Sequence, residues 1–385
     1  MNKTDITCDV VIVGGGLIGA TLACGLAAYG VDVAVVDRIT PEDSISPDFD
    51  GRASAIAHTS KVALEGIGLW PIIAGETQPI DEIRVSDGPS LMFLHYDHAD
   101  LGDNPLGHMA ENRALRAGLV TLMHQTQGLT VLAPAEITEV ARTEGRAAVA
   151  LDDGRTINCR LVAACDGRAS ATRTQAGIGV TGWTYKQQAI VTTIDHERSH
   201  DGIAHERFLS SGPFAILPLK GGHRSSLVWT EKSVLVGSFM ALDDGAFLDE
   251  VAERVGGFLG DVSLVGPRFC HPLGLQVAER YTDTRLVLVG DAAHGIHPIA
   301  GQGLNLGLRD VAALMDILVD AKRYGLDLAH SAGLERYQRW RRADNLLMAG
   351  MTDVLNRLFS NDIPPVRMAR DLGLAAVNSM PPLKR

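Results

Sequence analysis

The opening of this chain restricts the fold more than any other feature of its 385 residues. An apolar run, Val10–Val13, leads into Gly14, Gly16 and Gly19, and a stretch of small residues typical of a buried helix follows. A second apolar run ends at Asp37, 21 residues after Gly16. This order predicts a strand, a glycine turn, a helix and a second parallel strand that together bind a dinucleotide.

Each glycine has a separate purpose in this pattern. Gly14 permits the tight turn, Gly16 lets the backbone approach a pyrophosphate, and Gly19 lets the helix pack closely on the strand. Asp37 is placed to hold a ribose hydroxyl. A second G-x-G-x-x-G pattern at residues 177–182 follows no apolar strand. We therefore interpret that second pattern as an ordinary turn.

A stretch near residue 290 has the form of a second ligand-binding turn. Leu286–Val289 is a buried-strand pattern that ends in Gly290 and Asp291, and a glycine-rich loop at residues 298–307 leads into a helical pattern. An aspartate at a strand tip can accept hydrogen bonds from sugar or ribityl hydroxyls. The first amides of a helix have no internal partner, so they can face an electron-rich ligand.

Composition excludes several classes of function. The net charge of −11 disfavours nucleic acid as a partner. The five cysteines are scattered and form no C-x-x-C pair, which favours a reducing cytoplasm over a disulfide framework. The start of the chain shows no secretory signal pattern, and its apolar run is too short to span a bilayer. His294 and His297 have no further ligand at metal-site spacing, so we expect no metal.

The C-terminal part differs in charge from the rest. Residues 336–385 carry nine Lys/Arg and four Asp/Glu, a net charge of +5. Residues 334–359 also show an apolar stripe at helical spacing. Two readings remain open: a solvated surface with a stripe that packs on the body, or a segment that docks on an anionic membrane or an acidic partner.

The remaining segments alternate between helical and strand patterns. We predict helices at residues 59–69, 104–127, 247–258 and 334–359, the first of them stopped by Trp70-Pro71. Strands are predicted at residues 80–96, 129–140, 147–151 and 161–165. From residue 182 to 230 the texture changes to short alternating strands, which indicates an antiparallel sheet inserted between halves of the nucleotide-binding unit.

Three segments carry a resemblance to a known family: Gly290–His294, His297–Gly307 and Gly212–Leu219. Tyr337, Arg341 and Asn345 add to it. The chain resembles the class A flavoprotein aromatic hydroxylases, which share the p-hydroxybenzoate hydroxylase fold, and within them the ubiquinone-biosynthesis hydroxylases. The resemblance covers nearly the whole chain.

The resemblance implies an α/β fold: a Rossmann-like FAD-binding domain, an inserted antiparallel β-sheet substrate domain and a C-terminal helical segment. The implied FAD-binding domain comprises residues 1–79, 97–181 and 271–330. The implied substrate domain comprises residues 80–96 and 182–270, and residues 331–385 form the helical segment.

The resemblance also implies roles for individual residues. Asp166 would serve both FAD and a nicotinamide donor, Asp291 would hold the ribityl chain, and Arg52 and Arg113 would lie beside the cofactor. If the resemblance is set aside, Arg52 is interpreted as a charged residue on a surface loop. Arg113 is then a solvent-exposed helix residue, and Asp166 is part of an ordinary turn. The implied FAD-binding set is Gly14, Gly16, Gly19, Asp37, Arg52, Arg113, Asp166, Asp291, Pro298, Gly301, Gly303, Leu304 and Asn305.

The implied activity is hydroxylation of a polyprenylated phenol in ubiquinone biosynthesis, with FAD, O₂ and NAD(P)H or another reductant. A flavin C4a-hydroperoxide would deliver the oxygen atom. This reaction needs little general acid–base catalysis. His205, His223 and His297 are candidates for assistance that the sequence does not rank. Hydroxylation of a small soluble aromatic acid and a non-catalytic FAD-binding scaffold remain as alternatives. Such a protein would be cytoplasmic, with a membrane surface or a biosynthetic complex as a further partner.

Overall fold

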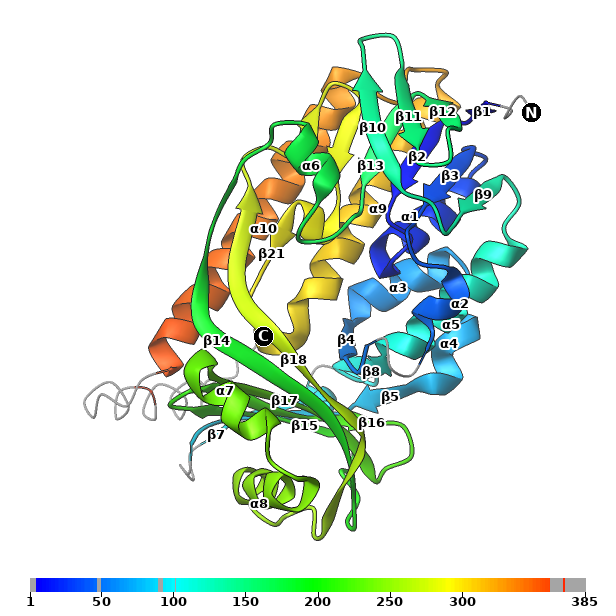
Figure 1. Cartoon of the computed structure of the whole chain (residues 1–385). Helices are drawn as coiled ribbons and strands as arrows, with labels where there is room; N and C mark the ends of the chain where they lie inside the picture. Colours follow the sequence, from blue (N-terminus) through cyan, green and yellow to red (C-terminus); the bar gives the residue numbers. More distant parts are fainter. Residues whose placement is uncertain (1–4, 47–49, 89–92, 101, 361–369, 371–385) are drawn as a thin grey trace.

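The computed structural model describes residues 5–46, 50–88, 93–100, 102–360 and 370 of the chain. It has a mixed α/β architecture in which a parallel sheet with helices occupies one end and a large mixed sheet lies across the other (Figure 1). The prolines at 364 and 365, which we expected to end the last helix, lie outside the described residues.

The parallel sheet follows directly from the apolar runs of the sequence. Three of its strands, Val10–Val13, Val33–Val36 and Leu161–Ala164, are buried along their whole length, as is usual where both faces of a parallel sheet are covered. One edge strand, β19, runs antiparallel to its neighbour. In spatial order the strands are β19 (Thr282–Asp283), β20 (Leu286–Leu288), β13 (Leu161–Ala164), β2 (Val10–Val13), β3 (Val33–Val36) and β9 (Leu129–Leu132).

Helix α1 (Leu17–Ala28) joins β2 to β3 and is buried almost all round, which explains why small residues fill it. A Cβ added at Gly25 would lie 2.4 Å from Met315 Sδ of helix α9 (Gln302–Arg323), so the two helices pack at close range. A four-stranded sheet packs on the same core. Its strands are β1 (Ile6–Thr7), β10 (Ile137–Arg142), β11 (Ala147–Leu151) and β12 (Thr156–Cys159). In this sheet β1 pairs with β12 in parallel.

A small antiparallel sheet and short helices build the remainder of this end. The predicted helix at residues 104–127 was too long: Gly107–Glu111 forms strand β8, and helix α5 (Asn112–Gln125) starts only after it. Trp70-Pro71 opens a new helix, because proline is tolerated in a first turn. The other elements are β4 (Ala53–Ala57), β5 (Thr77–Ile80), α2 (Pro41–Ser44), α3 (His58–Gly66), α4 (Trp70–Ile73) and α6 (Ala171–Gln175).

The large sheet contains the predicted antiparallel strands, but β6 pairs with β15 in parallel. Helices α7 (Ser233–Met240) and α8 (Asp244–Val255) cover one of its faces. We had predicted α8 but not α7. In spatial order the strands are β21 (His294–Gly295), β18 (Val262–Ala278), β14 (Val180–His196), β17 (Arg224–Lys232), β16 (Gly212–Leu219), β15 (Ile203–Leu209), β6 (Glu82–Asp87) and β7 (Phe93–Asp97).

Strands β14 and β18 are 17 residues long and run from the large sheet up to the parallel-sheet end, as Figure 1 shows. They therefore extend past residues 182 and 270, where we expected the inserted unit to begin and end. Gln276 and Val277 of β18 pair with β21, directly after the turn that carries Asp291. The large sheet is thus attached to that turn by main-chain hydrogen bonds.

The last described helix, α10 (Ser331–Phe359), confirms the predicted long helix and packs along α9. Phe359 is buried, whereas Trp340, Leu347 and Met351 are more than half exposed. The predicted apolar stripe is therefore only partly covered. In the described part of the chain, no helix has the length and apolar character needed to cross a membrane.

Candidate functional site

The turn after β2 uses its glycines in different ways. Gly14 has a positive φ of 97°, and a Cβ there would lie 2.6 Å from the carbonyl oxygen of Cys165. A Cβ on Gly19 would lie 1.9 Å from the Gly14 carbonyl oxygen. A Cβ on Gly16, in contrast, meets no described atom within 4 Å. Gly14 and Gly19 therefore serve backbone packing, while Gly16 leaves room for a ligand.

Gly16 borders a cavity of about 400 Å³ that extends from the turn after β2 to the start of α9. The lining joins segments that are almost 300 residues apart in the sequence. It is mainly apolar, with acidic and basic side chains at separate points. The expected site residues that line the cavity are Gly16, Asp37, Arg52, Asp291, Gly303 and Leu304.

Asp37 follows β3 and is held firmly by the backbone around it. Its Oδ2 accepts a hydrogen bond from the Gly15 amide at 2.5 Å, and its Oδ1 accepts one from the Ile39 amide at 2.8 Å. These bonds fix the carboxylate at the edge of the cavity beside the glycine turn. Asp37 thus lines the cavity beside the glycine turn, and its binding to a ribose stays a prediction from the spacing to Gly16.

Arg52 belongs to a charged group on the cavity wall. Its Nε and Nη2 donate to the two carboxylate oxygens of Asp50, at 2.9 and 3.0 Å, and Arg116 donates to the same carboxylate. Burial alone would raise the pKa of Asp50, but the two arginines hold it well below its usual range. The Asp50 carboxylate therefore stays ionised and keeps both guanidinium groups in position.

The second arginine expected beside the cofactor was Arg113, and the structure places its side chain on the exposed side of α5, outside the cavity lining. Arg116 lies three residues further on, is 8% exposed and lines the cavity. The helix starts at Asn112, and its buried side includes Asn112, Arg116 and Leu119. The helical period places Arg116, and not Arg113, on this buried side.

Asp291 lies on the 3₁₀ turn η3 (Gly290–Ala292), after β20, and its carboxylate forms no hydrogen bond to the part of the chain that the structure describes. Gly290 has a positive φ of 62°, which a side chain would strain. The pKa of Arg52 is raised: burial opposes the shift, but Asp50 and then Asp291 outweigh it. Asp291 and Arg52 therefore lie close enough to interact across the cavity.

The loop before α9 contributes backbone and small residues. Gly301 caps the helix with a left-handed φ of 62°, and a Cβ on Gly303 would meet no described atom within 4 Å. A ligand can therefore approach α9 closely at Gly303, where the positive end of the helix dipole lies. Pro298 is exposed and lies outside the cavity lining.

Asn305 has a supporting role that its sequence position did not reveal. It is buried, and its Oδ1 accepts hydrogen bonds from the Ala57 amide at 2.9 Å and the Ser60 hydroxyl at 2.7 Å. Its Nδ2 donates to the Ala55 carbonyl at 2.8 Å. Asn305 thus joins the start of α9 to β4 and α3 instead of facing the cavity.

The known proteins that this chain resembles agree with this geometry. Residues 7–345 match a family described as FAD binding domain. The ubiquinone hydroxylase UbiL of Rhodospirillum rubrum is 53% identical over 383 residues, covering 100% of this chain and 89% of that protein. The 3-demethoxyubiquinol 3-hydroxylase of Escherichia coli is 35% identical, covering 98% of this chain and 96% of that protein.

The chain belongs to the FAD-binding family that contains the ubiquinone hydroxylases.

Solved structures show the same fold. The p-nitrophenol 4-monooxygenase PnpA of Pseudomonas putida aligns with a TM-score of 0.82 at 20% identity, covering 98% of this chain and 96% of that one. PqsL of Pseudomonas aeruginosa, titled a probable FAD-dependent monooxygenase, aligns with a TM-score of 0.79 at 25% identity, covering 95% and 100%. The family match and the named hydroxylase relatives identify the protein as an FAD-dependent monooxygenase, and the solved structures show that it has the aromatic-hydroxylase fold.

The cavity residues of this family member fit FAD. The open space at Gly16, beside the start of α1, suits the pyrophosphate. Asp37 suits the adenosine ribose, and Asp291, with no hydrogen-bond partner among the described residues, suits the ribityl hydroxyls. The start of α9 near Gly303 suits the electron-rich end of the flavin ring.

Asp166, expected to serve FAD and the nicotinamide donor, caps α6 instead of lining the cavity. Its Oδ1 accepts a hydrogen bond from the Ser170 hydroxyl at 2.5 Å, and its Oδ2 accepts one from the Thr172 amide at 3.0 Å. Gly167, beside it, does line the cavity. Arg173 of α6 donates to the Ala292 carbonyl at 2.9 Å, which supports the turn that carries Asp291.

A buried charge network behind this turn was missed by the sequence analysis. Asp310 of α9 is fully buried, and its Oδ2 accepts hydrogen bonds from the Gly290 amide at 3.0 Å and interacts with His294 Nε2 at 2.6 Å. Its Oδ1 accepts from Arg341 Nε at 2.7 Å. Burial would raise the pKa of Asp310, but His294 and Arg341 lower it. The network joins the Asp291 turn to both α9 and α10.

The three histidines named in the sequence analysis lie apart from the cavity. The His205 ring contacts Phe258 in a tilted arrangement, with 4.6 Å between the ring centroids, on the face of the large sheet that α7 and α8 cover, and burial lowers its pKa to about 4. His223 is exposed on a hairpin. His297 is fully buried against Tyr185, and burial lowers its pKa to about 4 as well. None of the three lines the cavity found among the described residues.

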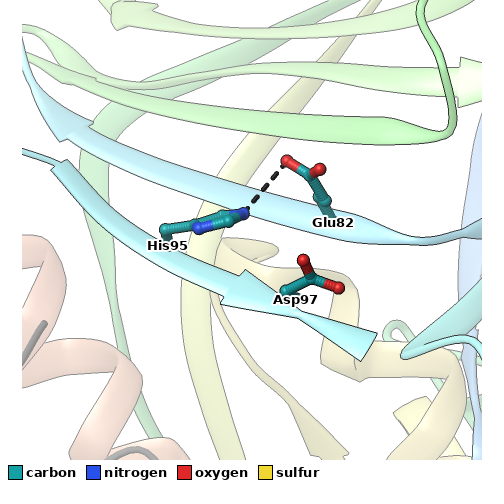
Figure 2. Close-up of side chains that lie close together, drawn as sticks. All are labelled: Glu82, His95 and Asp97. Atoms are coloured by element: carbon teal, nitrogen blue, oxygen red, sulfur yellow. Dashed lines mark hydrogen bonds and ion pairs between the residues drawn. The ribbon is translucent and has the colours of Figure 1, made fainter. Parts of the chain in front are cut away.

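A cluster on the β6–β7 hairpin has the composition of a metal site, and Figure 2 shows its members Glu82, His95 and Asp97. Their possible ligand atoms lie within 4.8 Å of one another. However, Glu82 Oε2 already accepts a hydrogen bond from Arg84 Nη2 at 2.7 Å and lies 3.0 Å from His95 Nε2. Protein groups account for this cluster, and we treat it as an ion-pair group.

Proposed function

We propose that this protein hydroxylates the aromatic ring of a polyprenylated phenol in ubiquinone biosynthesis. The observation that carries the proposal is the FAD-compatible cavity in a chain that is 53% identical to a protein named ubiquinone hydroxylase. O₂ would be the co-substrate, and NAD(P)H or another reductant the electron donor. Residues 80–96 and 182–270 would form the substrate domain, residues 1–79, 97–181 and 271–330 the FAD-binding domain, and residues 331–385 the helical segment.

Bound FAD would supply electron transfer and the activation of O₂, while the protein supplies placement. Asp291 would hold the ribityl chain, and Arg52, fixed by Asp50, would lie beside the flavin. The positive end of the α9 dipole would stabilise negative charge on the ring. Asn305 would hold the start of α9 at a fixed position relative to β4.

The face of the large sheet opposite α7 and α8 supports a neutral phenolic substrate. Its middle strands contribute Val191, Ala215, Leu217 and Val228. The acidic Glu206 lies on the same face. A hydroxylase of small aromatic acids needs a basic group for the substrate carboxylate, and an acidic group there would repel it. The composition of this face thus favours a phenol over an aromatic acid.

The function is tested by loss of the gene. Cells without this protein should accumulate one prenylated ring precursor that lacks a hydroxyl group, and mass spectrometry would identify it. The purified protein should consume O₂ with a short-chain prenylated phenol and a reductant. An unchanged precursor profile together with no oxygen consumption would contradict the proposal and favour a non-catalytic FAD-binding scaffold.

We also propose that the exposed side of α10 contacts an anionic membrane surface. Trp340, Leu347 and Met351 are 52%, 65% and 53% exposed, and Arg336 and Arg339 are exposed near the start of the helix. Arg341, which we counted with these charges, is internal because it pairs with Asp310. A substrate with a polyprenyl tail resides in a bilayer, so a hydroxylase that works at its surface needs such a face.

We expect the protein to float with anionic vesicles at low salt, and less at high salt because the Debye length falls from about 10 Å at 0.1 M to about 3 Å at 1 M. Leu347→Glu combined with Met351→Glu should abolish flotation. Val234→Glu, at an 85% exposed apolar site on α7, is the control and should change nothing. If wild-type protein stays unbound even at low salt, the substrate must be delivered by a partner.

A further inference from the structure

Glu206 occupies an unusual place in the middle of the large sheet. It lies on β15, where it pairs with Ala215 of β16 on one side and with Val85 of β6 on the other. Its neighbours along the strand on the same face are Ala204 and Phe208. The side chain therefore stands on the face opposite α7 and α8, in a row of apolar residues.

This face is turned toward the cofactor-binding end. Ala204 shares an apolar cluster with Met109 of β8, against which Ala53 and Ala55 of β4 also pack. Phe208 shares a second cluster with Ile299, which follows Pro298 in the loop before α9. Since Glu206 lies between Ala204 and Phe208, its side chain lies between two contacts that join the sheet to the cofactor-binding end, one through β8 and β4 and one through the loop before α9.

The Glu206 carboxyl group has no hydrogen bond or ion pair within the part of the chain that the structure describes. Glu206 itself is half-buried, and its neighbours Val85 and Leu217 also keep some exposed surface, so a ligand can reach the carboxyl group from this face. An ionised carboxylate among apolar groups carries a desolvation free-energy cost unless a hydrogen-bond donor or a cation pairs with it. The site is therefore built to receive a hydrogen-bond donor from a ligand that is otherwise apolar.

Burial raises the pKa of Glu206 to about 7, and no neighbouring charge contributes to this shift. The ionisable groups that face it on this side of the sheet are Asp87, which pairs with Arg370, and Tyr96. From the cofactor side and β18, Arg52 pairs with Asp50, and His271 lies near them. Glu206 is thus poised to exchange a proton near neutral pH.

We propose that Glu206 is a catalytic residue that accepts the hydrogen bond, and then the proton, of the phenolic hydroxyl group of the substrate. This inference rests on the proposed function, because it requires a phenol as the substrate. The apolar residues around Glu206 would contact the ring and the prenyl chain, while the carboxylate identifies the hydroxyl group and orients the ring toward the loop before α9.

The proton balance is simple. As one oxygen atom of O₂ bonds to the ring, the phenolic O–H bond breaks, its electron pair moves into the ring, and its proton moves to the Glu206 carboxylate. The ring carbon then loses its own proton to solvent, which restores aromaticity, and Glu206 returns its proton to the phenolate oxygen. The second oxygen atom leaves as water, with two electrons supplied by the reductant.

The test compares wild-type holoenzyme with Glu206→Gln. The probes are 2-geranylphenol and its O-methyl ether, which lacks the hydroxyl proton, and binding is followed through the visible absorption of the oxidised bound FAD. Because a hydrogen bond to a charged group contributes roughly tenfold or more in affinity, wild-type protein should prefer the phenol by about that factor. Glu206→Gln should lose most of this preference.

A second readout is the pH profile. In wild-type protein, kcat/KM should fall as the pH drops below about 7, because protonated Glu206 cannot accept the phenolic proton. In Glu206→Gln this limb should disappear and the rate should be low throughout. Glu231→Gln is the matched control: Glu231 is a buried glutamate on β17, and its side chain stands on the opposite face and accepts the Lys232 amide.

The outcomes separate the two proposals. If wild-type protein neither binds nor oxidises 2-geranylphenol, the proposed function fails. If it does both, but Glu206→Gln keeps the phenol preference and the acid limb, the function stands and the role of Glu206 is overturned. A loss of both features in Glu231→Gln as well would also overturn it, because the effect would then belong to the sheet as a whole.

Discussion

Gly16→Val should yield a folded protein that purifies without FAD. The backbone at Gly16 has φ of −65° and ψ of −172°, which any residue adopts, and no described atom would touch the added Cβ within 4 Å. The methyl groups would instead occupy the space beside the α1 amides that the pyrophosphate needs. We expect FAD affinity to fall by at least about a hundredfold, roughly 2.7 kcal/mol.

The measurement is the flavin content of purified protein and the affinity on reconstitution, together with circular dichroism to show the fold. Gly14→Val and Gly19→Val are informative companions. Their Cβ atoms would lie 2.6 and 1.9 Å from backbone oxygens, so we expect these proteins to misfold rather than lose FAD selectively. Wild-type flavin content in folded Gly16→Val would show that the pyrophosphate lies elsewhere.

Asp310→Ala should cost more stability than any surface substitution on α9. It would leave Arg341, whose side chain is 3% exposed, with less compensation in the interior, and would remove the acceptor for the Gly290 amide. Removing one partner of a buried ion pair typically costs about 3–5 kcal/mol. Urea unfolding of the FAD-free protein should show this loss, and the loosened Asp291 turn should also weaken FAD binding.

Asp316→Ala on the same helix is the control, because Asp316 is half exposed and its ion pair with Arg336 should contribute little. The effect of Asp310→Ala should also depend on pH. The pKa of Asp310 in the folded protein is lowered from 3.8, so its stabilisation is present above about pH 4 and is lost as the pH falls further. Equal losses in both variants at pH 7 would contradict the role assigned to the network.

Local patterns predicted much of the cofactor-binding end. The buried four-residue strands, the glycine turn and the long helices at residues 302–323 and 331–359 are each visible in a short window of sequence. The parallel pairing of β6 with β15 was not predictable in this way, because its partners are more than 100 residues apart. Helix α7 was missed because its apolar residues do not form a stripe with a helical period.

The site residues also divide into those that a short window of sequence predicts and those that depend on distant neighbours. Asp291 stands at a strand tip within a recognisable string, so its place on the cavity was predicted. Arg116 was missed because its partner, Asp50, lies 66 residues away in the sequence. The sequence did not indicate a role for Asp310 or Glu206, because the residues around them are distant in the chain. Asp310 pairs with Arg341, and the strand of Glu206 packs near the loop around Ile299.

The cavity is lined by residues from Gly15 to Leu304, and its far wall is held by Arg341 through Asp310. On a ribosome that adds roughly 5–20 residues per second, the first of these residues emerges long before the last. A nascent chain therefore cannot retain FAD until most of it has been synthesised. FAD can therefore stabilise only chains that have folded after most of their synthesis. We expect the supply of FAD to set the fraction of these molecules that resists proteolysis.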